Sequence, residues 1–307
     1  MNQITTEIMS QMKKSFELTQ LKDYCKTNYF GAVKKFLQSH EGNLRNMDEL
    51  SLLHVKEFLA NLLHVKKLKI GTVNNYRSAL KYLFEIVLEK KWCDKQVPFL
   101  KGYKTLPTVL SKESVMSVVN SAENILYSAL FLTVYASGIR IDEALNLRIS
   151  DIDTSMMQIH IRKSKNGSAR KAILSEKNLI FLRKYFKEWW LKKFGQFERE
   201  DYLFCLMKKN ARLSYVTALK AFSRAVHKAG VAPTATIHSL RHSFAVYLLE
   251  KGTSLGTIKE LLGHRSLRST LIYTRLASYS KMGVKSPLDY EDSTEVSEKN
   301  MEEAPNK

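Results

Sequence analysis

The sequence has little from which a disulfide framework, a metal site or a membrane anchor could be built. Its three cysteines, Cys25, Cys93 and Cys205, form no even set and show no spacing typical of metal ligands. The longest apolar run, Ile125 to Ala136, is too short to span a bilayer, and the N-terminal residues contain no long apolar segment. We therefore expect a reduced, cytoplasmic protein without a membrane anchor.

Negative charge is also scarce, except at the C-terminus. The chain has 49 Lys and Arg against 30 Asp and Glu, which gives a formal net charge of +19. Residues 1–105 carry 18 basic against 10 acidic residues and residues 106–285 carry 29 against 13, whereas residues 286–307 carry 2 against 7. A basic surface of this size raises both the affinity and the encounter rate for nucleic acid. Composition alone leaves open a basic protein that binds no nucleic acid.

Ligands for a cofactor are missing as well. The sequence contains neither a set of metal ligands at a recognised spacing nor a phosphate-binding glycine loop. It therefore implies no metal ion, no ATP and no other cofactor.

What the sequence does have is length and helical periodicity. With 307 residues and a hydrophobic content of 44%, the chain can form two domains with separate cores. Apolar residues recur at helical spacing within residues 24–39, 52–65 and 72–92, and a proline- and lysine-containing segment then interrupts the pattern. We expect a mainly α (α+β) protein divided as follows: a helical domain over 1–95, a linker over 96–109, a mostly helical second domain with a small antiparallel sheet over 110–285, and an acidic, disordered tail over 286–307.

The small sheet is predicted from the segment between Met157 and Leu174. Met157, Ile159 and Ile161 alternate with polar residues, and Asn166-Gly167 is a signal for a type I′ turn. We expect a β-hairpin that projects Lys165 from its tip.

The segment with the most candidate catalytic side chains runs from His238 to Tyr273. His238 and Arg241 are spaced to share one face of a helix, and Gly252 and Ser254 predict the end of that helix and the start of the next. Tyr273 adds a phenol, one of the few side chains that can form a covalent intermediate with phosphorus. The combination predicts an active site.

A second cluster follows the apolar run that ends at Ala136. Gly138 predicts the end of a buried helix, so that Arg140 emerges from a turn beside the core. Glu143 is spaced to hold the guanidinium of Arg140 in one orientation. Taken alone, this pair also fits an ordinary surface ion pair that contributes little.

Together, the two clusters resemble the signature of the tyrosine recombinases, also called the phage integrase family. The family pattern has a first arginine box, then His-x-x-Arg, Leu-Gly-His, Thr and Tyr. The matching residues here are Ser137, Gly138, Ile139, Arg140, Glu143, Ala144, His238, Arg241, Leu262, Gly263, His264, Thr270 and Tyr273. Ser137 stands where the family usually has Thr.

The resemblance implies a site-specific DNA recombinase that cleaves and rejoins strands through a 3′-phosphotyrosine intermediate. In that chemistry Tyr273 attacks the phosphorus, while Arg140 and Arg241 stabilise charge on the phosphate oxygens. His238 is expected to take or relay the proton of Tyr273, His264 completes the catalytic set, and Glu143 supports it. No metal ion takes part.

The general acid for the leaving 5′ oxygen is expected in the hairpin. The family usually has Gly-Lys-Gly at the hairpin turn, with an Arg downstream; here the turn has Ser164-Lys165-Asn166, with Arg170 downstream. We favour Lys165 for this role, and Lys163 is the alternative.

The first domain is similar to the core-binding domain of the family. Asn74, Arg77 and Lys81 line one face of its third helix, and Lys101 and Lys104 lie in the linker, so these residues are expected to contact DNA. The resemblance implies double-stranded DNA with inverted-repeat core sites as the partner, bound by a dimer on one site and by a tetramer in the synaptic complex. Integration, excision and resolution, as in a mobile element, are all compatible with the motifs.

Other activities remain open at this point. A type IB topoisomerase or a hairpin-forming resolvase uses related chemistry, and it would act on one duplex without exchange between two sites. A non-catalytic DNA-binding protein on the same fold would have lost Tyr273 or an arginine, and all of these residues are present.

Overall fold

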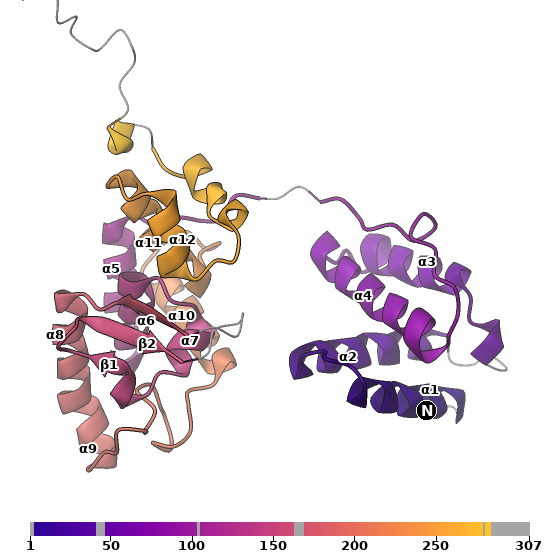
Figure 1. The fold of residues 1–307 in the computed structure, drawn as a ribbon, viewed down its shortest axis with the longest axis horizontal. Helices are drawn as coiled ribbons and strands as arrows, with labels where there is room; N and C mark the ends of the chain where they lie inside the picture. The colour runs from indigo at the N-terminus through magenta and orange to yellow at the C-terminus, as the bar shows by residue number, and fades with distance from the viewer. Residues whose placement is uncertain (1–2, 41–46, 103–104, 163–168, 279, 284–307) are drawn as a thin grey trace, which may run out of the picture. The chain divides into compact units, whose positions relative to one another are not determined.

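The structure, a computed structural model, describes residues 3–40, 47–102, 105–162, 169–278 and 280–283. The chain divides into two compact units, Met1–Thr105 and Leu106–Lys307, called unit 1 and unit 2 below (Figure 1). Each unit has a hydrophobic core of its own. Among the described residues, no helix is both long enough and apolar enough to cross a membrane.

Unit 1 is helical. Its elements are α1 (Gln3–Glu17), α2 (Asp23–Ser39), η1 (Met47–Glu49), α3 (Leu52–Ala60), η2 (Asn61–Val65), α4 (Ile70–Tyr82) and η3 (Leu83–Val87). α2 packs against α1, α3 and α4, and η2 and η3 are π-helical turns that continue α3 and α4. The core of the unit includes Ile8, Met12, Val33, Phe36, Val55, Leu80 and Phe84.

Two of the helices expected in unit 1 are confirmed, and the third ends earlier than its pattern predicts. The chain leaves the helix at Val87, not at Trp92, because Glu89 has a positive φ of 51°. The side chain of Lys90 then donates to the carbonyl oxygens of Met47 and Leu50. α1 was not predicted; its buried residues, such as Ile8, complete the core.

Unit 2 is mostly helical, with one small sheet. Its elements are α5 (Lys112–Asn120), α6 (Ile125–Ser137), α7 (Ile141–Leu145), η4 (Ile149–Asp151), β1 (Ile152–Asp153), β2 (Gln158–Ile161), β3 (Arg170–Ile173), α8 (Glu176–Tyr185), η5 (Phe186–Trp190), α9 (Leu191–Phe194), α10 (Tyr215–Lys228), α11 (Ile237–Glu250), α12 (Leu255–Leu262), η6 (Leu267–Ser269), η7 (Leu271–Arg275) and η8 (Ser280–Met282). The expected mainly α (α+β) fold is confirmed.

Helix α6 is the centre of unit 2. Its sequence is apolar on all sides, and α5, α8, α10 and α11 pack around it (Figure 1). Asn124 caps its start by accepting a hydrogen bond from the amide of Tyr127. Gly138 ends it with a φ of 65°, a left-handed conformation that glycine adopts without a steric penalty. The predicted buried helix and its glycine stop are thus confirmed.

The sheet has the order β1-β2-β3, and both strand pairs are antiparallel. Ile159 pairs with Ala172 in the register of β2 and β3, which places both side chains in the core. The predicted strand pair between Met157 and Leu174 is confirmed. The Asn166-Gly167 turn lies outside the described residues.

Candidate active site

Arg140 is held at the start of α7 by Glu143. The backbone amide of Arg140 donates to Oε2 of Glu143 over 2.8 Å, and its Nη1 donates to Oε1 over 2.9 Å. Glu143 is buried, whereas about a fifth of the Arg140 side chain stays exposed, at 19%. The third contact runs from Nη2 to the carbonyl oxygen of Gly263, 3.3 Å away. The carboxylate therefore orients a guanidinium that still faces solvent on one side.

Arg241 lies one turn into α11 and is almost completely buried, with 4% of its surface exposed. Its Nη1 donates to the carbonyl oxygen of Gly138 over 2.7 Å, and its Nη2 donates to that of Leu262 over 2.6 Å. These carbonyls belong to the C-terminal ends of α6 and α12, which carry partial negative charge. Burial and the charge of Arg140 lower the pKa of Arg241 to about 10, so it stays protonated at neutral pH.

His264 and Tyr273 lie in the segment that follows α12, and their rings lie against each other. Gly263 ends α12 with a φ of 62°, and the next residue, His264, pairs through Nδ1 with the hydroxyl of Thr270 over 2.9 Å. The rings of His264 and Tyr273 are stacked, with an interplanar angle of 14°. Tyr273 lies in η7 and is only 1% exposed. Burial raises the pKa of its phenol, and Arg241 and Arg140 partly offset this.

His242 belongs to this cluster, although no motif singled it out. Its Nδ1 lies 3.2 Å from the Tyr273 hydroxyl, within hydrogen-bonding distance. Burial, His238 and Arg241 lower the pKa of His242 to about 4, so the imidazole is neutral at pH 7. The sequence offered one signal that could have found it: a histidine directly after Arg241 and four residues after His238.

Arg170 is a second residue that the motifs placed only loosely. It begins β3, and its Nη2 donates to Oε2 of Glu143 over 2.7 Å, so the same carboxylate holds both Arg170 and Arg140. Within the described part of the chain, the buried Nε and Nη1 atoms of Arg170 meet no hydrogen-bond acceptor. Since three guanidinium groups, those of Arg140, Arg170 and Arg241, interact with one another around a single carboxylate, the cluster has an excess of positive charge suited to an anion.

The structure therefore brings Arg140, Glu143, Arg241, His264 and Tyr273 together in unit 2. His238 lies at the start of α11 and is exposed, one helical turn before His242. Lys163 and Lys165 lie outside the described residues. Within the described residues, no group of His, Cys, Asp and Glu side chains is arranged to hold a metal ion.

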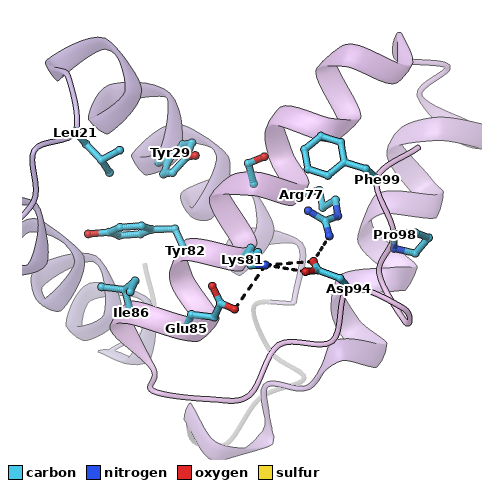
Figure 2. A pocket seen from close by; sticks show the side chains of 11 residues that line it. Leu21, Tyr29, Arg77, Lys81, Tyr82, Glu85, Ile86, Asp94, Pro98 and Phe99 are labelled. Atoms are coloured by element: carbon cyan, nitrogen blue, oxygen red, sulfur yellow. Dashed lines mark hydrogen bonds and ion pairs between the residues drawn. The ribbon is translucent and has the colours of Figure 1, made fainter. Parts of the chain in front are cut away.

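Two of the residues expected to contact DNA, Arg77 and Lys81, have partners within unit 1. Arg77 is 4% exposed; it pairs with Asp94, and its Nε donates to the carbonyl oxygen of Val97 over 2.7 Å. Lys81 pairs with Asp94 over 2.9 Å. Figure 2 shows both cations pointing toward Asp94 at one side of a pocket of about 540 Å³.

The other expected DNA contacts differ in their surroundings. Asn74 exchanges two hydrogen bonds, each 3.0 Å long, with the backbone of Leu100, so it holds the segment that follows Asp94 against α4. Lys101 is exposed, and Lys104 lies outside the described residues. In this conformation Asn74 and Arg77 stabilise unit 1 itself, and Lys101 is accessible to a ligand.

Family models match both units. Residues 108–279 match the model described as "Phage integrase family", and residues 8–94 match "Phage integrase, N-terminal SAM-like domain". The first match covers more than half of the chain and contains every residue of the cluster described above.

Individual relatives agree with the family models. The chain is 30% identical over 227 residues to tyrosine recombinase XerA of Pyrococcus horikoshii, an alignment that covers 72% of this chain and 75% of that protein. Among solved structures it is similar to XerH site-specific recombinase bound to a palindromic difH substrate, with a TM-score of 0.67, 24% identity, and coverage of 83% and 77%. A lambda integrase (75–356) dimer bound to a COC′ core site gives a TM-score of 0.67 at 18% identity, covering 87% and 94%. At these identities the two structures support the fold.

Proposed function

The chain belongs to the phage integrase family and is a site-specific recombinase, and from this premise we propose that Tyr273 is the nucleophile that cleaves DNA. The observation that carries this role is the position of its hydroxyl beside His242, within the charge field of Arg140 and Arg241. The phenolate oxygen attacks the scissile phosphorus, the bond from phosphorus to the 5′ oxygen breaks, and a 3′-phosphotyrosine remains. The covalent bond conserves the energy needed to rejoin the strand.

Arg140 and Arg241 have the role of stabilising charge that develops on the nonbridging phosphate oxygens. Both guanidinium groups are fixed before DNA arrives, Arg140 by Glu143 and Arg241 by two helix-terminal carbonyls. Donors held in place in this way need not reorganise as the reaction proceeds, which is the basis of electrostatic catalysis. Arg170 adds further donors at the same carboxylate. His264, held by Thr270, completes the set of residues around the phosphate.

The leaving 5′ oxygen needs a proton, and Lys165 in the β2–β3 connection is the proposed donor, with Lys163 as the alternative. β2 and β3 are joined across residues 162–169, and β3 begins at Arg170, which contacts Glu143 beside Arg140. Arg170, the first residue of β3 after this connection, therefore lies within the arginine cluster. His238 on α11 remains a candidate for relaying the proton of Tyr273.

The proposed substrate is double-stranded DNA with inverted-repeat core sites, bound by a dimer on each site and by a tetramer when two sites are paired. Support comes from the relatives: XerH is described on a palindromic difH substrate and lambda integrase as a dimer on a core site. A palindromic site matches a two-fold symmetric dimer. Of the DNA-facing candidates in unit 1, the exposed Lys101 fits a phosphate contact best, whereas Lys81 would first have to leave Asp94.

Covalent trapping tests the nucleophile. A duplex substrate is first isolated from a random pool by covalent capture. A nick is placed in this duplex so that the fragment released by cleavage diffuses away. The protein is then incubated with the nicked duplex, and adducts are separated on denaturing gels. The wild-type chain is expected to form an adduct, and Tyr273→Phe is expected to bind the duplex without forming one, because only the hydroxyl is removed. Tyr247→Phe, on the exposed side of α11, is the matched control and should still form the adduct. A surviving adduct in Tyr273→Phe would falsify the assignment.

A further inference from the structure

The Tyr273 hydroxyl meets a nitrogen base in the structure, and the base is not the histidine expected from the motifs. Nδ1 of His242 lies 3.2 Å from the hydroxyl, and the centroids of the two rings are 5.8 Å apart. His238, the residue expected to take this proton, lies one turn earlier on α11 and is exposed, whereas the hydroxyl belongs to a side chain that is 1% exposed. Of the two histidines, His242 therefore has the geometry for direct proton transfer.

We propose that His242 is the catalytic base that accepts the proton of Tyr273 during strand cleavage. The proposal rests on the proposed function, since it assumes that Tyr273 is the nucleophile. The O–H bond of Tyr273 breaks and its proton binds to Nδ1 of His242. The phenolate oxygen forms the bond to phosphorus, the bond from phosphorus to the 5′ oxygen breaks, and that oxygen takes a proton from the general acid. In rejoining, the imidazolium returns its proton to the departing phenolate.

The surroundings of His242 fit a base that becomes stronger when DNA binds. The charged and titratable groups that face it come from three places: Arg241 and His238 lie on α11, His264 follows α12, and Arg140, at the start of α7, acts on His264 and Tyr273. In the free protein these groups and burial keep the imidazole neutral, so its Nδ1 can accept a proton. A phosphate bound between the arginines would offset their charge and thereby favour the imidazolium.

The position of His238 gives the proton a route outward. It precedes His242 by four residues on the same helix, so the two side chains lie on one face, and His238 contributes to the lowered pKa of His242. Because His238 is exposed, it can exchange protons with solvent. His242 thus acts on the phenol, and the neighbouring His238 can pass a proton to water.

His242→Asn separates proton transfer from positioning. An asparagine amide places a hydrogen-bonding atom near the position of Nδ1, so it can hold the phenol but cannot act as a base at neutral pH. With the nicked duplex described above, the single-turnover rate of adduct formation is expected to fall by about 10²-fold or more, while duplex affinity is unchanged. His227→Asn, an exposed histidine of α10, is the matched control and should cleave at the wild-type rate.

Two further measurements exclude a purely structural role. Between about pH 6 and about pH 9 the rate of His242→Asn should rise continuously, because cleavage then depends on phenolate formed without a base, whereas the wild-type rate should level off. In addition, 3,5-difluorotyrosine at position 273 has a more acidic phenol that needs less help from a base. It should accelerate His242→Asn by a larger factor than the wild type.

Any other outcome would contradict the proposed role of His242. If His242→Asn cleaves at the wild-type rate, His242 only packs against Tyr273; if it cleaves faster, the hydrogen bond stores the phenol in an inactive position. If difluorotyrosine accelerates both proteins equally, the loss is structural. Failure of the proposed function is distinguishable from these results, because in that case the wild-type chain itself forms no adduct that Tyr273→Phe abolishes.

Discussion

Arg241 donates a hydrogen bond to the carbonyl oxygen of Gly138, 2.7 Å away, and thereby ties α11 to the end of α6. The same guanidinium reaches the carbonyl of Leu262 at the end of α12. Arg140, by contrast, is fixed from its own turn by Glu143 and keeps part of its surface exposed. The two arginines of the site therefore differ in how much of the fold depends on them, and this difference can be measured.

Arg140→Ala is expected to reduce the rate of adduct formation by about 10²–10³-fold, as for the loss of one oxyanion donor, with little change in melting temperature. Arg241→Ala should reduce the rate at least as much and also lower the melting temperature, since it leaves two buried helix-end carbonyls without their donor. Single-turnover cleavage and thermal unfolding of both variants check this. Near wild-type cleavage by both variants would mean that the phosphate binds elsewhere.

Gly138→Ala is expected to be strongly destabilising. Gly138 has a φ of 65°, and an added Cβ would lie 2.3 Å from Cδ1 of Phe244, a buried ring atom. The left-handed conformation costs an alanine roughly 1–2 kcal/mol, and overpacking a core typically costs roughly another 1–3 kcal/mol. Gly230→Ala is the matched control, because its φ is 62° but its Cβ would meet nothing within 4 Å. Chemical denaturation should give Gly138→Ala the larger loss; equal losses would show that the Phe244 ring moves aside freely.

Much of this site could be predicted because its residues are marked by local patterns. The glycine stop at Gly138 placed Arg140 just beyond a helix end, and the cap at Ser254 located the start of α12, as the structure has them. The contact between His242 and Tyr273 could not be found in this way, because the two residues lie 31 positions apart and their contact depends on how α11 packs against η7.

Unit 1 shows the same limit of sequence patterns. The spacing of Arg77 and Lys81 placed them on one helix face, but that face is covered by the chain near Asp94 and Val97, which folds back on α4. The exposure of a charged helix face depends on this later segment, whose irregular backbone carries no periodic signal. A pattern of charges therefore located the face correctly without revealing its partner.

Acid is expected to destabilise unit 2 between about pH 6.5 and pH 4. His242 and His264 have pKa values lowered from 6.5 to about 4 by burial and nearby arginines, so the unfolded chain binds protons in this window while the folded protein does not. Stability is full above pH 6.5 and falls as the pH decreases toward 4. Lowered carboxylate pKa values, such as that of Asp153 at about 2, reduce stability mainly below pH 4. Hydrogen-exchange protection factors of the α11 and α12 amides should fall as the pH decreases across the window, and less so in His242→Asn. A flat profile would contradict the buried, neutral histidines.

The general acid can be identified by changing the leaving group. A lysine that protonates the 5′ oxygen becomes dispensable when sulfur replaces that oxygen, because a thiolate leaves with little help from an acid. Lys165→Ala is therefore expected to cleave ordinary DNA slowly and to recover on a 5′-phosphorothiolate duplex. Lys163→Ala should show only weaker binding with a shallower salt dependence, as expected for the loss of a phosphate contact. Rescue of Lys163→Ala instead would assign the role to that residue. If neither variant recovers, the donor lies outside the β2–β3 connection, and His264 is the next residue to test, because its ring stacks on Tyr273 and its Nδ1 is already held by Thr270.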